Sequence, residues 1–279
     1  MKYFIPLITI CIFTIFLTGC SNGSSDNNAE VQSASGTDSW YRPSPLITWH
    51  IQLNGEINTS HHVQLYDIDL FDSPVALIQQ LQATGIKVIC YFSAGSYEEG
   101  RPDSDSFMPD EKGNPLDGWP GEKWLDIRSD NVRSIMKDRL DMAKSKGCDG
   151  VDPDNMDAYT NDSGHELTAS DQLEYNRFIA NEAHSRNLAV GLKNDVAQIN
   201  ELVNYFDFAV NEQCFEYNEC SAVTPFITNN KPVLNIEYKE EYINDSLKRD
   251  ALCSDAIDKQ FSSLILPLEL DDTFRLSCL

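Results

Sequence analysis

The sequence lacks the patterns that mark several common kinds of site. It has no CxxC pair, no HExxH or His-x-His motif among its five histidines, and no GxSxG motif after residue 39. Zinc ribbons, zinc proteases and serine hydrolases with a nucleophile elbow carry those patterns. No glycine-rich phosphate loop follows the first predicted strand, which disfavours a dinucleotide-binding fold. We therefore expect no metal and no cofactor.

Positive charge is scarce as well. Lys and Arg total 21 against 44 Asp and Glu, so the formal net charge is −23. An acidic surface repels nucleic acid and anionic lipid, and it attracts cationic ligands. Solubility alone would explain such a charge equally well, so composition excludes partners more firmly than it identifies one.

A single long apolar run lies at the N-terminus. Residues 1–19 have one lysine, an apolar core and small residues before Cys20, which is the pattern of an export signal. The stretch Leu17–Cys20 resembles the bacterial lipoprotein cleavage box, which implies that Cys20 is lipidated and anchors the chain. Residues 20–39 are polar and read as a flexible tether. Because Ser21 rather than Asp follows Cys20, we expect the outer membrane or the cell surface.

Export permits disulfides among the six cysteines of the remaining chain. Cys214 and Cys220 are close enough in sequence to close one loop. Cys253 and Cys278 could attach the C-terminus to the preceding segment. Cys90 lies in an apolar run and is expected to be a plain buried thiol.

Residues 40–279 alternate between apolar strand-like runs and helical patterns, which predicts a parallel sheet. The expected helices cover 73–85, 130–147 and 170–187, with shorter ones near 197–204 and 246–260. The expected strands are 46–53, 63–70, 86–95, 150–155, 188–194, 206–213, 231–238 and 263–270. Eight such repeats predict one α/β domain, a (β/α)8 TIM barrel, and we expect a monomer. An open, doubly wound sheet is the alternative.

The segment 96–129 is long and rich in Pro, Gly and Asp. A loop of this length in a small domain is usually functional or disordered. Its aromatic residues, including Trp119 and Trp124, favour an ordered lid.

Polar residues gather at the ends of the predicted strands, where barrel enzymes place their active sites. The strands begin with apolar residues, so the asymmetry predicts a functional cleft. The candidates are Asp67, Tyr91, Asp152, Asp154, Lys193, Asn194, Glu212 and Glu237. In the stretch GVDPDNMD (150–157), strand alternation puts Asp152 and Asp154 on one face. Asp154 is then at the mouth, Asp152 one layer deeper, and Asp157 at the rim.

The same stretch is a poor calcium loop, because Met156 and Asp157 occupy positions where an EF-hand needs a ligand and a glycine. Two carboxylates on different strands suit glycosidic cleavage better, one as acid and one as nucleophile or base. Asp154 with Glu212 is one such pair, and Asp67 with Glu237 is another.

Several ordered motifs resemble glycoside hydrolase family 114, the endo-α-1,4-polygalactosaminidases. They are TWHIQLNG (48–55), LYDIDLFD (65–72), VICYFSAGSYE (88–98), WLDIRS (124–129), GCDGVDPDNMDAY (147–159), GLKND (191–195), VNEQC (210–214) and NIEY (235–238). The resemblance implies a (β/α)8 barrel that cuts α-1,4-linked galactosamine polymers within the chain, with Asp154 and Glu212 as the catalytic carboxylates. It also implies cleft positions for Asp67, Tyr91, Lys193, Asn194 and Glu237.

Such a polymer is cationic, which agrees with the acidic composition. We expect Asp67, Asp152, Asp157 and Glu237 to attract its amines, and Trp49, Tyr91 and Trp119 to pack on sugar rings. By analogy with other barrel glycosidases, Asp154 is assigned as nucleophile and Glu212 as acid/base. The alternative is a non-catalytic, glycan-binding surface lipoprotein on the same barrel.

Overall fold

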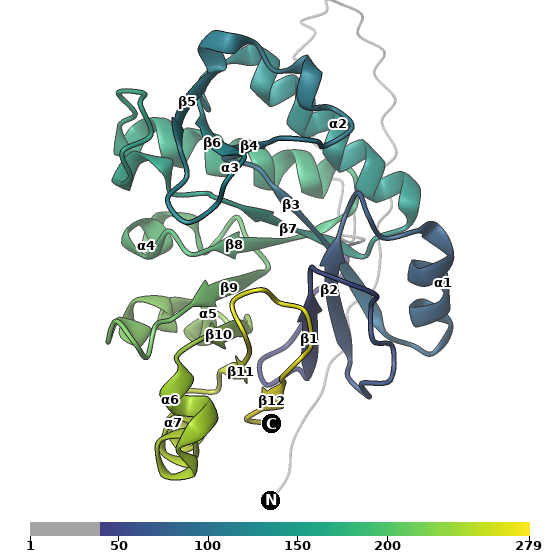
Figure 1. The fold of residues 1–279 in the computed structure, drawn as a ribbon, viewed down its shortest axis with the longest axis vertical. Helices are drawn as coiled ribbons and strands as arrows, with labels where there is room; N and C mark the ends of the chain where they lie inside the picture. Colours follow the sequence, from purple (N-terminus) through teal and green to yellow (C-terminus); the bar gives the residue numbers. More distant parts are fainter. Residues whose placement is uncertain (1–39) are drawn as a thin grey trace, which may run out of the picture. The chain divides into compact units, whose positions relative to one another are not determined.

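The computed structural model describes residues 40–279, so the expectations for residues 1–19 and 20–39, and for Cys20, lie outside it. Parallel strands curl round the centre of the fold (Figure 1). In order they are β1 (Trp49–Gln52), β2 (Leu65–Asp69), β3 (Lys87–Ser93), β7 (Gly150–Asp154), β8 (Ala189–Lys193), β9 (Phe208–Glu212), β10 (Val233–Glu237) and β11 (Ser262–Ile265). All eight predicted strands are present, and the (β/α)8 class is confirmed. Residues 40–279 form one compact unit.

Helices connect most of these strands. They are α1 (Val75–Ala83), α2 (Asp130–Lys146), α3 (Ala169–Ser185), α4 (Ile199–Leu202), α5 (Thr224–Thr228), α6 (Glu240–Asn244) and α7 (Ser246–Asp258). α2 shows how the sequence sets its limits, because the Ser129 side chain caps its first turn and Gly147 ends it at a φ of 89°. Among the described residues, no helix has both the length and the apolarity needed to cross a bilayer.

Alternation along the strands produces two apolar layers. Inward-facing side chains such as Trp49, Phe208 and Ile236 fill the barrel interior. Outward-facing side chains such as Val88 and Val151 pack with α1, α2 and α3. Each strand is therefore buried on both faces, which explains its near-continuous apolar sequence.

The barrel closes between β1 and β11 without a described strand ladder. The backbone N–H groups of Leu53 and Asn54 both donate to the Leu270 carbonyl, at 3.0 and 3.3 Å. β11 pairs on its free edge with the short antiparallel strand β12 (Leu276–Ser277). The C-terminal segment thus lies at the seam between β11 and β1.

Three disulfides form within the described residues. Cys214–Cys220 and Cys253–Cys278 confirm the two predicted pairings. The expectation that Cys90 is a free thiol is wrong, because it bonds to Cys148. The two cysteines are 58 residues apart in sequence, but β3 and β7 are neighbours in the sheet, so the fold brings them together.

The long segment after β3 is ordered. It folds into a small antiparallel sheet with the order β4 (Ser96–Glu98), β6 (Glu122–Leu125) and β5 (Lys112–Pro115). Two short 3-10 turns, Ser104–Ser106 and Pro109–Glu111, lie between β4 and β5. Arg101 ties the segment to Asp69 at the end of β2, with an N···O distance of 2.7 Å.

Candidate active site

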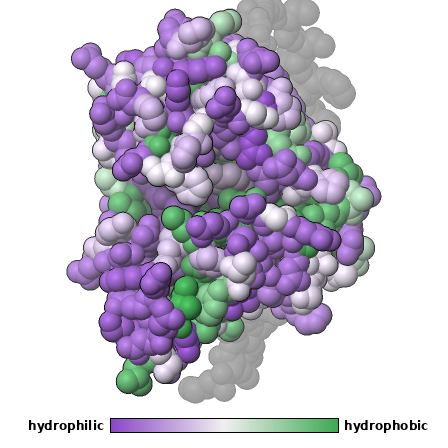
Figure 2. Space-filling model, in the orientation of Figure 1, coloured by the Kyte–Doolittle hydropathy of each residue, from purple (hydrophilic) through white to green (hydrophobic). Residues whose placement is uncertain are grey.

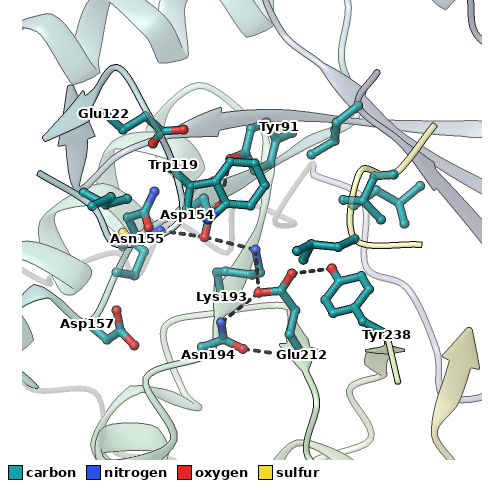
Figure 3. Close-up of a pocket in the computed structure, with 16 residues that line it drawn as sticks. Tyr91, Trp119, Glu122, Asp154, Asn155, Asp157, Lys193, Asn194, Glu212 and Tyr238 are labelled. Atoms are coloured by element: carbon teal, nitrogen blue, oxygen red, sulfur yellow. Dashed lines mark hydrogen bonds and ion pairs between the residues drawn. The ribbon is translucent and has the colours of Figure 1, made fainter. Parts of the chain in front are cut away.

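The carboxyl ends of the strands surround a cavity that also reaches the small sheet β4–β6 (Figure 3). Its polar lining comes from Tyr91, Glu122, Asp154, Asn155, Asp157, Lys193, Asn194, Glu212 and Tyr238, and Trp119 is among its apolar lining residues. The surface in Figure 2 is mostly hydrophilic, with only small apolar patches. The cavity lies at the carboxyl ends of the strands, where the sequence predicted a cleft.

Asp154 ends β7 and is held by three donors. Tyr91 Oη donates to Oδ2 at 2.8 Å, Lys193 Nζ donates to Oδ1 at 3.0 Å, and the backbone N–H of Asn155 donates to Oδ1 at 2.7 Å. Burial acts to raise the pKa of Asp154, but the Lys193 charge and these hydrogen bonds outweigh it and lower that pKa. Asp154 is therefore an ionised carboxylate at neutral pH.

Glu212 ends β9 and faces the same lysine. Tyr238 Oη donates to its Oε1 at 2.5 Å, and Asn194 Nδ2 donates to its Oε2 at 3.1 Å. Asn194 Oδ1 in turn accepts the backbone N–H of Glu212 at 2.9 Å. Asn194 therefore fixes both the backbone and the side chain of this residue.

Lys193 lies between the two carboxylates. Its Nζ is 3.0 Å from Asp154 Oδ1 and 3.3 Å from Glu212 Oε2, so those two oxygens are no farther apart than the sum of these distances. Burial acts to lower the pKa of Lys193, but the surrounding carboxylates outweigh it and raise that pKa. The ammonium thus keeps its charge and lets two carboxyl groups share one small site.

The turn after β7 is shaped by close backbone packing. Asn155 has a φ of 60°, and its Nδ2 donates to Ser93 Oγ at 2.9 Å. A Cβ on Gly95 would stand 1.7 Å from the carbonyl oxygen of Asn155. Both Ala94 and Gly95 donate their N–H groups to the Asp154 carbonyl. Glycine at position 95 therefore lets β3 approach and hold the end of the strand that carries Asp154.

Asp67 and Asp152 lie below this layer and are fully buried. Their carboxyl oxygens have no donor among the described residues, so they can bond to each other only when one carries a proton. Burial and the neighbouring carboxylates raise the pKa of Asp152 to about 7, against the opposing effect of Lys193. Burial and Asp152 raise the pKa of Asp67 well above its ordinary value. The prediction that Asp67 and Asp152 attract the sugar amines directly is wrong, because both are buried out of reach of a polymer.

Two further expected contacts do not reach the cavity. Glu237 faces the outer side of β10, where its Oε1 accepts the Phe215 N–H at 2.9 Å and it is fully buried. Trp49 points inward but lies too deep, with 1% of its surface exposed and its Nε1 donating to the Ser262 carbonyl at 2.7 Å. Glu237 was assigned to the wrong face of the strand, and Trp49 to the wrong depth.

The rim includes Asp157, which strand alternation placed there, and Glu122, which sequence reasoning passed over. Glu122 on β6 lines the cavity and accepts the Ser96 hydroxyl at 2.7 Å. Burial, against that hydrogen bond, raises the pKa of Glu122 to about 7. Burial and Asp154 raise the pKa of Asp157 to about 6. Glu122 belongs to the inserted segment, so no strand-end pattern marked it. Tyr238, at the end of the predicted strand 231–238, also lines the cavity.

Comparison with known proteins agrees with this geometry. The crystal structure of Aspergillus fumigatus Ega3 in complex with galactosamine superimposes with a TM-score of 0.81 at 45% sequence identity, covering 85% of this chain and 97% of Ega3. The glycoside hydrolase domain of PelA from Pseudomonas aeruginosa shares the fold, with a TM-score of 0.65 at 12% identity over 82% of this chain and 98% of that domain. Among proteins with curated descriptions, none matches the chain. The model of glycoside hydrolase family GH114 matches residues 29–279, and this chain belongs to that family.

Proposed function

We propose that the protein is an endo-acting glycoside hydrolase that cleaves α-1,4-linked polymers containing galactosamine. Its membership of family GH114 supports glycosidic cleavage. The 45% identity to Ega3, a protein solved with galactosamine bound, supports an amino sugar as the substrate. No cofactor is part of the proposal.

The observation that carries the proposal is the arrangement of Asp154 and Glu212 on either side of Lys193 (Figure 3). Their side chains are 18% and 24% exposed, so a sugar can reach both. Two carboxyl groups facing one site are what glycosidic cleavage requires. A protein that only bound glycan would need acidic and aromatic groups, but not this opposed pair.

Asp154 is assigned as the nucleophile, because its lowered pKa keeps it ionised. Glu212, two strands away on β9, is the acid/base. Because both carboxyl groups contact the same ammonium, at 3.0 and 3.3 Å, their spacing is compatible with the short separation of retaining enzymes. The proposal therefore includes retention of the anomeric configuration.

The reaction proceeds in two displacements. Asp154 attacks the anomeric carbon and forms an ester to the sugar, while Glu212 gives its proton to the departing glycosidic oxygen. Glu212 then takes a proton from water, and the water oxygen replaces Asp154 at the anomeric carbon. The second displacement returns both carboxyl groups to their starting forms. Tyr91 and Tyr238 hold the two groups at the positions these steps need.

Selectivity for an amine follows from the charges around the cavity. Lys193 is the cation that lines it, whereas the carboxyl groups of Glu122, Asp154, Asp157 and Glu212 do so from several sides. Lys193 is neutralised by its contacts with Asp154 and Glu212, which leaves Glu122 and Asp157 at the rim. These two carry raised pKa values of about 7 and about 6. A protonated sugar amine beside them would favour their ionised forms and be bound in return.

Action within a chain fits the extension of the site on two sides. A second hollow shares Asp157, Asn194 and Glu212 with the central cavity and adds Tyr217 and Glu219. A third shares Leu116, Trp119 and Asn155. Trp119 is 48% exposed, so its ring offers a flat surface for a sugar. A polymer can therefore extend past the catalytic pair in both directions.

The proposal also includes export and attachment through lipid on Cys20, which rests on the sequence of residues 1–20. The polymer would then be met outside the cytoplasm. A monomer stays our prediction.

A cleavage assay tests the proposal. The purified protein is incubated with partly deacetylated α-1,4-galactosaminan, and the products are sized by mass spectrometry. We expect a spread of internal fragments, and slower cleavage as salt is raised, because screening weakens capture of the cationic chain. Binding without any cleavage would support the glycan-binding alternative. Equal cleavage of a neutral, fully acetylated chain would contradict recognition of the amine.

A further inference from the structure

A second cluster of ligand-type side chains lies away from the active site, at the seam where the barrel closes. His50 is on β1, His61 is in the loop 53–64, and Asp272 is in the C-terminal segment. Their ligand atoms all lie within 4.8 Å of one another. His61 Nε2 is 3.0 Å from Asp272 Oδ1, and His50 Nε2 is 3.8 Å from the same oxygen. His50 alternates with the inward-facing Trp49, so the cluster is on the outer side of β1.

His50 has no hydrogen-bond partner that would explain it. The residue is fully buried, and neither ring nitrogen is hydrogen-bonded among the described residues. A buried polar group left unpaired is costly, and an ion that completes it is one of the few explanations.

The other two ligands are held in place by their neighbours. Asn58 Nδ2 donates to Asp272 Oδ2 at 2.7 Å. Tyr66 Oη donates to the Asn58 carbonyl at 2.9 Å and to the His61 carbonyl at 3.2 Å, which fixes the loop that carries His61. Partners of this kind orient the ligands of natural metal sites.

One cation stands near the cluster. The Arg275 guanidinium is tied to the Trp49 carbonyl through Nη2 at 2.7 Å, and Asp272 offsets its charge. A dication must therefore bind against one positive charge. Two imidazoles and a carboxylate supply strong ligands for a borderline metal but few for Ca²⁺ or Mg²⁺.

We propose that His50, His61 and Asp272 bind one Zn²⁺ ion, with water as the fourth ligand. Tetrahedral zinc with ligand bonds of roughly 2.0–2.2 Å needs neighbouring ligand atoms about 3.3 Å apart. The distances of 3.0 and 3.8 Å to Asp272 bracket that value, and the two histidines offer ligand atoms within 4.8 Å of each other, so the side chains must draw together around the ion. His61 and Asp272 are 22% and 10% exposed, which leaves a route for the ion and room for water.

The ion would act as a structural clamp. It would join β1, the loop 53–64 and the C-terminal segment, where β1 and β11 share no ladder in the described part of the chain. Sequence gave no sign of the site because His61 and Asp272 are 211 residues apart. The inference is independent of the proposed function, since none of its ligands lines the catalytic cavity.

The test uses the purified, chelator-treated protein, titrated with ZnCl2 by calorimetry and followed by thermal unfolding. We expect one ion per chain and a higher Tm with Zn²⁺. His61→Gln keeps a hydrogen-bonding side chain but loses a ligand, and it should weaken binding roughly 100-fold or more. His62→Gln is the matched control, because His62 is the exposed neighbour and should leave binding unchanged.

A second variant guards against misfolding. Asp272→Asn retains an acceptor for Asn58, so its metal-free Tm should stay near that of the wild type while Zn²⁺ stabilisation disappears. Co²⁺ should give the intense visible bands of a tetrahedral site in the wild type and in His62→Gln only. The proposal is overturned if Zn²⁺ leaves the wild-type Tm unchanged, which would reduce the cluster to a His61–Asp272 ion pair. Binding that survives His61→Gln would also overturn it, because the ion would then lie elsewhere.

Discussion

Asp152 and Asp154 are two residues apart on the same strand and face the same side, yet their environments shift their pKa values in opposite directions. Asp154 meets Lys193, Tyr91 and a backbone N–H, and its pKa is lowered. Asp152 meets Asp67 in a buried layer without donors, and its pKa is raised to about 7. The donors available in each layer, and not the residue type, decide whether the pKa of an aspartate is lowered or raised.

The difference teaches how the barrel separates chemistry from support. The upper layer is open to solvent and holds two carboxyl groups around one ammonium. The lower layer is closed, and its two carboxyl groups become compatible by sharing a proton. Lys193 is within electrostatic reach of both layers. An ionised lower layer would compete with the upper layer for the positive charge of Lys193, and protonation of the lower layer prevents this.

The largest effect should come from removing either carboxylate of the upper layer. Asp154→Asn and Glu212→Gln should each lower kcat by roughly 10³-fold or more, because a nucleophile or an acid/base is lost. Asp138→Asn, on the exposed face of α2, is the control. Reducing-end release measures the rates, and circular dichroism checks the fold. Activity near the wild-type level in both variants would remove the catalytic assignment.

The next effect should come from the lysine that makes the two layers differ. Lys193→Met removes the charge that holds the pKa of Asp154 low, so that pKa should rise. The acid limb of kcat/KM, which reports ionisation of Asp154, should move to higher pH, and kcat should fall roughly 100-fold. The measurement is a full pH–rate profile. An acid limb at the wild-type pH would mean that Lys193 does not set the charge of Asp154.

Some features of the fold and of the site could be predicted from the sequence and others could not, depending on the kind of sequence pattern that marked them. Strand positions followed from continuous apolar runs, and Asp154 with Glu212 followed from strand ends and family motifs. The prediction for Glu237 was wrong because successive side chains of a strand point to opposite faces, so an error of one residue moves a side chain to the other face. Trp49 failed because depth along a strand is not visible in sequence. Glu122 and the Cys90–Cys148 bond depend on how distant segments meet in the fold.

A smaller effect should appear at the rim of the cavity. Glu122 and Asp157 have pKa values raised to about 7 and about 6, so they gain charge as the pH rises through that window. Affinity for the cationic polymer should therefore increase between roughly pH 5.5 and 7.5. Binding of galactosaminan to the inactive Glu212→Gln protein measures this directly. In the added Glu122→Gln and Asp157→Asn background the affinity should change little with pH, and an unchanged slope would remove these residues from amine binding.

The lower layer, Asp67 and Asp152, should affect activity least, and its test is a measurement of stability. The pKa of Asp67 is raised in the folded state above its unfolded value of about 3.9. Its protonated form therefore stabilises the fold fully below that value, and this stability is lost as the pH rises through the folded pKa. Asp67→Asn carries no such dependence. Its Tm relative to the wild type should be higher at pH 8.5 than at pH 5, and a constant difference would show that Asp67 is not held neutral.

The central claim is that Asp154 is the nucleophile and Glu212 the acid/base, and azide rescue tests it most directly. Each residue is changed to Ala, an activated α-galactosaminide is supplied with sodium azide, and the anomeric configuration of the glycosyl azide is determined by NMR. The account predicts the β-azide from Asp154→Ala, because azide takes the place of the nucleophile. It predicts the α-azide from Glu212→Ala, because azide attacks the sugar–Asp154 ester. The reverse assignment of the two products would contradict it.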